Sequence, residues 1–246
     1  MGTMPREIPP TIPPDTVDVW RVRLDERAGR DDGGENSILS EDERRRAARF
    51  HEPRHAALYA AGRAALREVL AHYTGERPAE IAIREEANGK PVLADRRCAW
   101  LNFNVSHARD VALIAVAARR RVGIDLEAVT TDIDLPALAK IVFSPEELAR
   151  WTALAAGERG AAFFATWVFK EAYVKALGEG LARPLPSITV DWSRAERFTR
   201  VEDAGHPEDA RAFRLYPLAS AAGFLAAVAV EGSPVAIRCG DWLAAR

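Results

Sequence analysis

The sequence contains little cysteine, since Cys98 and Cys239 are the only two among its 246 residues. Two cysteines so far apart form neither a pair at metal-ligand spacing nor a disulfide framework. The longest apolar runs, 111–118 and 224–230, have the length of buried strands and are too short to span a bilayer. Residues 1–15 contain five prolines and no apolar signal core. We therefore expect a cytoplasmic protein.

The chain also lacks an excess of one charge, because 34 Lys and Arg residues face 36 Asp and Glu residues, for a net charge of −2. No overall field would draw it to nucleic acid or to an anionic membrane, so we expect neither as a partner. A hydrophobic content of 48% is ordinary for a globular protein, and the length suffices for one large domain or two modest ones.

Residue patterns divide the chain into a proline-rich, poorly ordered lead-in (1–15) and two halves (16–120 and 121–246). In each half, helical patterns precede a compact set of strands, one of which is an apolar run of small residues. This repeated plan predicts an α+β fold with two similar halves.

Local signals predict the ends of several elements. Ser40 and Glu43 form a capping box, and Pro53 and Gly75 mark the start and end of a longer helix. Between these signals, residues 25–36 are rich in Gly, Asp and Glu and predict a loop. The main predicted strands cover 17–24, 101–106, 111–117 and 121–127, and a long predicted helix covers 161–177.

The most informative short stretch is 123–127, Gly-Ile-Asp-Leu-Glu, which follows a basic turn. Side chains on a strand alternate faces, so Asp125 and Glu127 point one way while Ile124 and Leu126 point the other. Two adjacent carboxylates repel each other unless a cation or a shared proton relieves them. The pattern favours a site for a hard metal such as Mg²⁺, although a solvated acidic face has the same spacing.

The run His51-Glu52-Pro53-Arg54-His55 matches the H-E-x-x-H signature of zinc proteases. That signature needs one continuous helix, which places both histidines on a single face. Pro53 suits a helix start, so we expect His51 and Glu52 to lie outside the helix that carries His55. We interpret the match as accidental.

Two further groups could bind phosphate or metal. Ser106 and His107 end an apolar strand, where a hydroxyl and an imidazole suit a phosphate; a structural histidine is the alternative. On the predicted helix 161–177, Trp167, Glu171 and Lys175 are spaced by four and share one stripe. Because a tryptophan normally faces the core, the two charges beside it need partners, although an exposed Glu–Lys pair has the same spacing.

Four motifs then follow one another in a fixed order: Gly-Lys-Pro at 89–91, Asn-Phe-Asn-Val-Ser-His at 102–107, Gly-Ile-Asp-Leu-Glu at 123–127, and Trp-Val-Phe-Lys-Glu-Ala-Tyr-Val-Lys at 167–175. Each motif alone is weak, but the ordered series is specific. It resembles the 4′-phosphopantetheinyl transferase superfamily, of the Sfp type named for the surfactin-synthetase activator, and the likeness covers residues 39–190.

The resemblance implies two α+β halves in one monomer, related by a pseudo-two-fold axis, with coenzyme A bound at an active site in the cleft between them. It also implies a reaction, in which the 4′-phosphopantetheine group of coenzyme A moves to a serine hydroxyl of an acyl or peptidyl carrier protein and 3′,5′-ADP is released. Such carriers serve fatty-acid, polyketide and nonribosomal-peptide biosynthesis. The sequence does not choose among them, nor does it decide whether acyl-coenzyme A is accepted.

Carried over residue by residue, the resemblance implies that Asp125, Glu127 and Glu171 are ligands of a Mg²⁺ that bridges the pyrophosphate. Glu171 is also the candidate base for the carrier serine, directly or through a water. Lys175 would stabilise the pyrophosphate and could protonate the leaving phosphate. The remaining implied contacts to coenzyme A are those of Lys90, Ser106 and His107 with the nucleotide phosphates and of Arg46 with the 3′-phosphate.

Two positions depart from the pattern or leave it open. Glu43 lies one turn before Arg46, at a position where related proteins often carry a basic residue. Either a neighbouring arginine takes the place of that basic residue, or the 3′-phosphate is bound less tightly. Glu147 lies where some relatives carry an acid suggested as an alternative base. A catalytically silent member of the same fold that binds coenzyme A or a carrier is the main rival interpretation, and the intact acids disfavour it.

Overall fold

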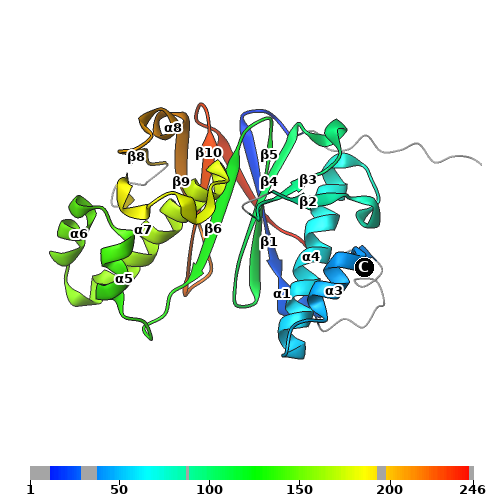
Figure 1. The fold of residues 1–246 in the computed structure, drawn as a ribbon, viewed down its shortest axis with the longest axis horizontal. Helices are drawn as coiled ribbons and strands as arrows, with labels where there is room; N and C mark the ends of the chain where they lie inside the picture. Colours follow the sequence, from blue (N-terminus) through cyan, green and yellow to red (C-terminus); the bar gives the residue numbers. More distant parts are fainter. Residues whose placement is uncertain (1–11, 29–37, 87–88, 193–197, 244–246) are drawn as a thin grey trace, which may run out of the picture.

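The computed structural model of the chain describes residues 12–28, 38–86, 89–192 and 198–243. Most of the predicted lead-in, 1–15, lies outside the described residues. Two sheets face each other at the centre of the molecule, and helices cover the outer face of each sheet (Figure 1). None of the helices in these ranges is long and apolar enough to cross a bilayer.

The first half is built on a four-stranded sheet with the strand order β11-β1-β5-β4. β1 (Thr16–Arg23) and β4 (Leu101–Ala108) flank β5 (Val111–Ala118), and both pair with it antiparallel. β11 (Ala236–Asp241) pairs parallel with β1. A strand from the far end of the sequence therefore completes the sheet of the first half.

On the outer side of this sheet lie α1 (Leu24–Ala28) and α4 (Pro53–Thr74), and α3 (Glu41–Ala47) packs against α4 (Figure 1). α4 ends at Gly75, which adopts a left-handed backbone with φ 72°, as the sequence predicts. The loop predicted over 25–36 is wrong at its start, because α1 forms there and buries Leu24. Residues 29–37 of that loop lie outside the described part of the chain.

The start of α4 confirms the interpretation of the zinc-protease signature. The helix begins at Pro53, and Glu52 before it has an extended backbone with φ −95° and ψ 122°. His51 therefore lies outside the helix that carries His55, and the two imidazoles do not share a helix face.

The second half is built on an antiparallel three-stranded sheet with the order β6-β10-β9. Its strands are β6 (Val122–Ala128), β9 (Phe213–Leu218) and β10 (Phe224–Glu231). The helices of this half are α5 (Leu135–Val142), α6 (Pro145–Thr152), α7 (Ala156–Leu177) and α8 (Pro207–Ala212). Each half also has a small two-stranded antiparallel sheet. In the first half β2 (Ile83–Glu85) pairs with β3 (Pro91–Leu93), and in the second half β7 (Ile188–Val190) pairs with β8 (Val201–Asp203).

Helix α7 crosses the outer face of the second sheet, and Gly123 of β6 allows it to lie very close. A Cβ atom at Gly123 would come within 2.2 Å of the Ala172 carbonyl oxygen and 2.3 Å of the Ala176 nitrogen. Only a residue without a side chain fits there. The glycine that opens the 123–127 stretch thus fixes the approach of the helix that carries Glu171.

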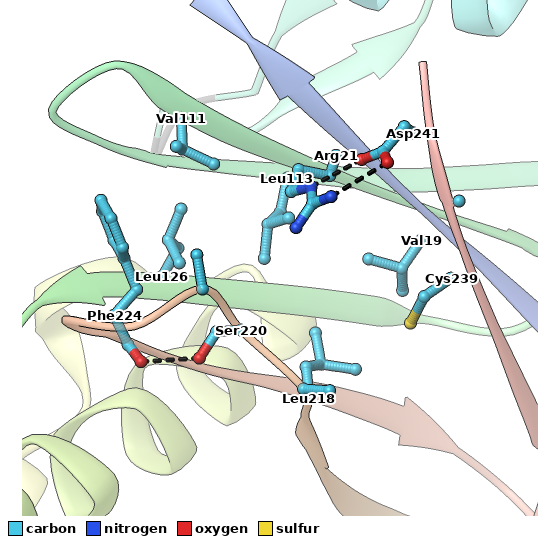
Figure 2. Close-up of a pocket in the computed structure, with 13 residues that line it drawn as sticks. Val19, Arg21, Val111, Leu113, Leu126, Leu218, Ser220, Phe224, Cys239 and Asp241 are labelled. Carbon is cyan, nitrogen blue, oxygen red and sulfur yellow. Dashed lines mark hydrogen bonds and ion pairs between the residues drawn. The ribbon is translucent and has the colours of Figure 1, made fainter.

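The inner faces of the two sheets share one apolar core, to which β5 contributes Leu113 and β6 contributes Ile124 and Leu126. β5 is buried on both faces, which explains why its sequence is a continuous apolar run. A cavity of about 170 Å³ lies in this core between the sheets and is lined by residues of both halves, including Leu113 and Leu126 (Figure 2). Asp125 and Glu127 do not line it.

Candidate active site

Polar side chains from three elements meet in a second cavity of about 560 Å³. β4 contributes Ser106 and His107. β6 contributes Asp125 and Glu127, and α7 contributes the stripe of Trp167, Glu171 and Lys175. The predicted alternation on the strand and the four-residue spacing on the helix are therefore confirmed, because both place these side chains toward one cavity.

β4 and β6 belong to different sheets, and two side chains connect them. The Ile124 amide donates to Asn104 Oδ1 at 2.8 Å, and the Leu126 amide donates to Ser106 Oγ at 3.2 Å. β6 has β10 as its partner on one edge, so these side chains satisfy backbone donors on the other edge. The site therefore lies where the two halves meet. The sequence interpretation gave Asn104 no role, although it lies within the second motif.

Asp125 lies at the centre of the polar group and is only 3% exposed. Its Oδ1 accepts from Lys175 Nζ at 2.6 Å and from Ser106 Oγ at 3.0 Å. Its Oδ2 is buried and has no hydrogen-bond partner among the described residues. An unpaired buried carboxylate oxygen is costly, so this atom is suited to accept a cation or a donor from a ligand.

The two other acids are held in an environment that disfavours their charge. Burial, and after it the negative charge of Asp125, raises the pKa of Glu127 and of Glu171 above the ordinary value of 4.5. Lys175 acts in the opposite direction on both. The cavity thus combines three carboxylates with one ammonium group, and a bound cation would relieve the remaining repulsion.

The residues present fit Mg²⁺ by their chemistry. Carboxylate oxygens are the ligands that Mg²⁺ prefers, and Asp125 Oδ2 offers a buried acceptor without a partner. Within the described ranges, no three His, Cys, Asp or Glu side chains lie close enough together to form a metal centre as they stand. Lys175 occupies the other oxygen of Asp125, so part of the countercharge in the cavity is the protein's own.

Two of the predicted coenzyme A contacts lie outside the residues that line this cavity. Lys90 Nζ donates to the Lys175 carbonyl oxygen at 2.8 Å, near the end of α7, where carbonyl groups carry partial negative charge. Arg46 lies on the surface, pairs with Glu85 at 3.1 Å and stands over the Tyr59 ring. The structure therefore brings Ser106 and His107 to the acids and leaves Lys90 and Arg46 apart from them.

Glu43 is part of the framework that attaches α3 to α4. It is buried, completes the predicted capping box with Ser40, and lies 2.6 Å from Arg63 and 2.7 Å from Arg67. Burial alone would raise the pKa of Glu43, but the two guanidinium groups outweigh it and hold that pKa below 4.5. The acid at position 43 is therefore paired with arginines of α4 and has a structural role.

Glu147, the alternative base, has no free oxygen with which to take a proton. Glu147 and Lys170 are both 0% exposed and lie 2.5 Å apart. Glu147 Oε2 also accepts from the Ser144 amide at 2.8 Å, and Oε1 accepts from the Val190 amide at 2.8 Å. Because it is enclosed and does not line the cavity, its role is to hold α6 against α7 and β7.

The side of the cavity beyond Glu171 is largely apolar. The end of α5 contributes Ile141 and Val142, and the segment after α7 contributes Pro184, Leu185 and Pro186. The cavity thus has a charged region on β4, β6 and α7 and an apolar wall formed by the end of α5 and by residues 184–186, with Arg183 beside that wall. This arrangement suits a ligand that is ionic at one end and uncharged along the rest of its length.

Comparison with known proteins gives the family. Residues 121–229 match the family model described as the 4′-phosphopantetheinyl transferase superfamily, and residues 34–119 match the model described as 4′-phosphopantetheinyl transferase, N-terminal. The 4′-phosphopantetheinyl transferase HetI of Nostoc sp. is 40% identical over 174 residues, which cover 70% of this chain and 73% of HetI. The 4′-phosphopantetheinyl transferase Sfp of Bacillus subtilis is 30% identical over 154 residues, covering 63% of this chain and 66% of Sfp.

Among solved structures, a holo-ACP-synthase from Plasmodium yoelii aligns with 46% of this chain and 94% of its own, at 18% identity and a TM-score of 0.34, a likeness too low to add to the assignment. The two family matches and the likeness to HetI are sufficient. The chain belongs to the 4′-phosphopantetheinyl transferase superfamily. It is an enzyme of that class with an α+β fold.

Proposed function

We propose that this protein transfers the 4′-phosphopantetheine group of coenzyme A to a serine hydroxyl of an acyl or peptidyl carrier protein, with Mg²⁺ and with release of 3′,5′-ADP. One observation carries the proposal. Asp125, Glu127 and Glu171 share a cavity with Lys175, and one buried oxygen of Asp125 has no hydrogen-bond partner in the described part of the chain. Phosphoryl transfer depends on positioning and on charge stabilisation, and this group supplies both.

Coenzyme A would lie with its pyrophosphate on the charged region and its pantetheine arm along the apolar wall. Ser106, His107 and Lys175 would then contact phosphate oxygens, because a hydroxyl, an imidazole and an ammonium group are suitable donors. Arg46 and Lys90 would meet the nucleotide end. The surface position of Arg46 leaves its guanidinium group accessible to a 3′-phosphate, in exchange for its ion pair with Glu85.

In the reaction, the carrier serine oxygen forms a bond with the phosphorus that bears pantetheine, and the bond from that phosphorus to the bridging oxygen breaks. Glu171 accepts the serine proton, directly or through a water. In the metal-free site, burial and the charge of Asp125 raise the pKa of Glu171, which favours uptake of a proton by its carboxylate. Lys175 stabilises the charge that develops on the leaving 3′,5′-ADP, and no covalent enzyme intermediate is needed.

Asp125, Glu127 and Glu171 would hold Mg²⁺. When bound, the ion stabilises negative charge on phosphate oxygens and lowers the pKa of a coordinated water. Occupation of Asp125 Oδ2 would satisfy a buried oxygen that has no hydrogen-bond partner among the described residues. Lys175, which lies on Oδ1, could then remain in place beside the pyrophosphate.

The same site suggests where the carrier docks and in what form the enzyme works. Ile141, which lines the cavity, is 63% exposed, so its apolar side chain is available for contact with a carrier docked at the cavity. We further propose that the enzyme works as a monomer, because residues from both halves of one chain line the cavity. Cys98 and Cys239 are both free thiols, as a reducing cytoplasm would leave them.

A single assay tests the proposal. The protein is mixed with an apo carrier protein, coenzyme A and Mg²⁺, and the carrier is weighed by mass spectrometry. We expect each carrier to gain one phosphopantetheine group, with loss of the gain when Mg²⁺ is removed and no loss with a zinc-selective chelator. Binding of coenzyme A without any mass gain across several unrelated carriers would instead identify a catalytically silent member of the fold.

A further inference from the structure

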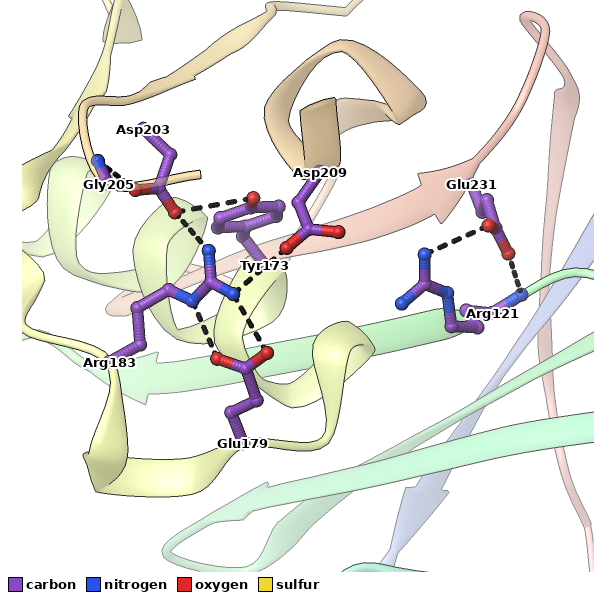
Figure 3. Close-up of polar contacts among 8 residues, drawn as sticks. All are labelled: Arg121, Tyr173, Glu179, Arg183, Asp203, Gly205, Asp209 and Glu231. Atoms are coloured by element: carbon purple, nitrogen blue, oxygen red, sulfur yellow. Dashed lines mark hydrogen bonds and ion pairs between the residues drawn. The ribbon is translucent and has the colours of Figure 1, made fainter. Parts of the chain in front are cut away.

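Arg183 lines the cavity beside the apolar wall and is one of the most enclosed arginines in the described part of the chain, at 4% exposure. Three carboxylates surround its guanidinium group (Figure 3). Glu179 binds it in a fork, with Nε at 2.7 Å and Nη2 at 2.8 Å. Nη2 also donates to Asp209 at 3.0 Å, and Nη1 donates to Asp203.

These contacts fix the orientation of Arg183 from several sides. The acids come from the turn after α7, from β8 and from α8, so they lie on three separate segments. Bidentate Arg–carboxylate pairs are geometrically restrictive, and a lysine cannot reproduce them. The Tyr173 ring lies 6.0 Å from the guanidinium carbon, which adds a packed aromatic side to the enclosure.

Arg183 is followed directly by the residues that form the wall. Pro184, Leu185 and Pro186 line the cavity next to it. A second buried cation fixes the same segment, because Lys170 Nζ donates to the Leu185 carbonyl oxygen at 3.0 Å and to the Val142 carbonyl oxygen at 2.7 Å. The two sides of the apolar wall are therefore joined to the helix that carries Glu171.

We infer that Arg183 is a positioning residue, which holds the segment 184–186 as the surface on which the pantetheine arm of coenzyme A packs. The inference rests on the proposed function for the identity of the ligand. Arg183 is not proposed to touch the reacting atoms, since its guanidinium group donates to Glu179, Asp203 and Asp209 (Figure 3). Arg183 affects the binding of coenzyme A through the position of the backbone of residues 184–186.

The test compares two ligands that differ by the arm. Coenzyme A carries pantetheine, whereas 3′,5′-ADP has only the nucleotide end. In Arg183→Lys the charge remains and the fork is lost. We expect the Kd of coenzyme A, measured by calorimetry, to rise about ten-fold, equivalent to about 1.4 kcal/mol, while the Kd of 3′,5′-ADP changes by less than about two-fold.

Arg27→Lys is the matched control, because Arg27 is also 4% exposed and pairs with Glu68 at 2.8 Å, but lies on α1 in the other half. It should change neither Kd. If Arg183→Lys does not fold, Glu179→Gln removes the fork while leaving Arg183 its pairs with Asp203 and Asp209, and the same two ligands are compared. Equal weakening of both ligands, or of neither, would overturn the inference. A lack of carrier modification by the wild type, with these Kd shifts intact, would reject the proposed transfer alone.

Discussion

Lys175 and Asp125 join helix α7 to strand β6, with Nζ 2.6 Å from Oδ1, and the same ammonium group lies 3.1 Å from Ser106 Oγ on β4. One cation thus contacts side chains of both halves at the point where three carboxylates gather. It offsets their repulsion in the free protein, and it remains close enough to serve a phosphate.

Replacing this cation provides the first prediction. In Lys175→Met, Asp125 would keep its burial and lose its ion pair, so the folded protein should be less stable and should bind Mg²⁺ more tightly, because the three carboxylates lose their countercharge. We expect kcat for carrier modification to fall at least 100-fold, the usual scale for removing a preorganised charge from a transition state. Steady-state transfer assays over a Mg²⁺ titration measure both effects. Near-normal turnover would remove Lys175 from the mechanism.

Glu171 and Glu147 make opposite predictions. Glu171→Gln should lower transfer by about 10²–10⁴-fold, because it removes the base, while the thermal midpoint changes little. Glu147→Gln should leave transfer per folded molecule near normal and lower stability by about 3 kcal/mol, because Lys170 would lose its countercharge inside the protein. Urea unfolding and single-turnover transfer on both variants separate the roles. A reversed outcome would make Glu147 the base.

Gly123 is expected to tolerate no side chain. In Gly123→Ala the new methyl group would overlap backbone atoms of Ala172 and Ala176, which cannot move without displacing α7. We expect a loss of about 3 kcal/mol or more, and reduced transfer in whatever folds. Gly157→Ala is the control. Gly157 lies on α7, and no other atom lies within 4 Å of the position that its Cβ would take. The control substitution should stabilise the protein by up to about 1 kcal/mol.

Glu43 should make stability depend on pH. Arg63 and Arg67 hold its pKa in the folded chain below 4.5, so the stabilisation is fully present above that pH and is lost as the pH falls through the folded pKa. Glu43→Gln should cost about 3 kcal/mol at neutral pH. The difference between variant and wild type should shrink in acid. Urea denaturation at several pH values measures it, and a difference independent of pH would show that the carboxylate charge is unimportant.

Ile141 should affect the carrier and leave coenzyme A alone. Ile141→Ser removes an exposed apolar contact at the cavity, and we expect the KM for the carrier to rise about ten-fold, with an unchanged Kd for coenzyme A. Leu243→Ser is the control, because Leu243 is even more exposed, at 77%, and does not line the cavity. An unchanged KM for the carrier in Ile141→Ser would show that the carrier docks on another face.

Short-range patterns predicted the parts of the site that depend on one element. Alternation along β6 predicted that Asp125 and Glu127 share a face, and spacing along α7 predicted the stripe of Trp167, Glu171 and Lys175. The capping box at Ser40 and the helix start at Pro53 were likewise readable, because each involves residues within one turn. The lead-in and most of the 25–36 loop are not tested by the described residues.

What the sequence could not predict are pairings across distance. Arg183 meets Asp203 and Asp209 from elements 20 and 26 residues away, and Glu147 meets Lys170 from another helix. No periodicity encodes such contacts, since they arise from tertiary packing. The hydrogen bond of Lys90 to the Lys175 carbonyl oxygen was unpredictable for the same reason, because the two residues are far apart in sequence and come together only in the folded chain.

The return of β11 to β1 gives the molecule two covalent crossings between its sheets, one from β5 to β6 and one from β10 to β11. A single crossing would connect the two sheets covalently at one point. Two crossings connect them at two points and therefore restrict the rotation of one sheet relative to the other. Cutting the chain near residue 120 would yield a first fragment whose β1 presents an unpaired edge, a template for aggregation. The first half cannot complete its sheet without β11, a strand that follows the second half in the sequence.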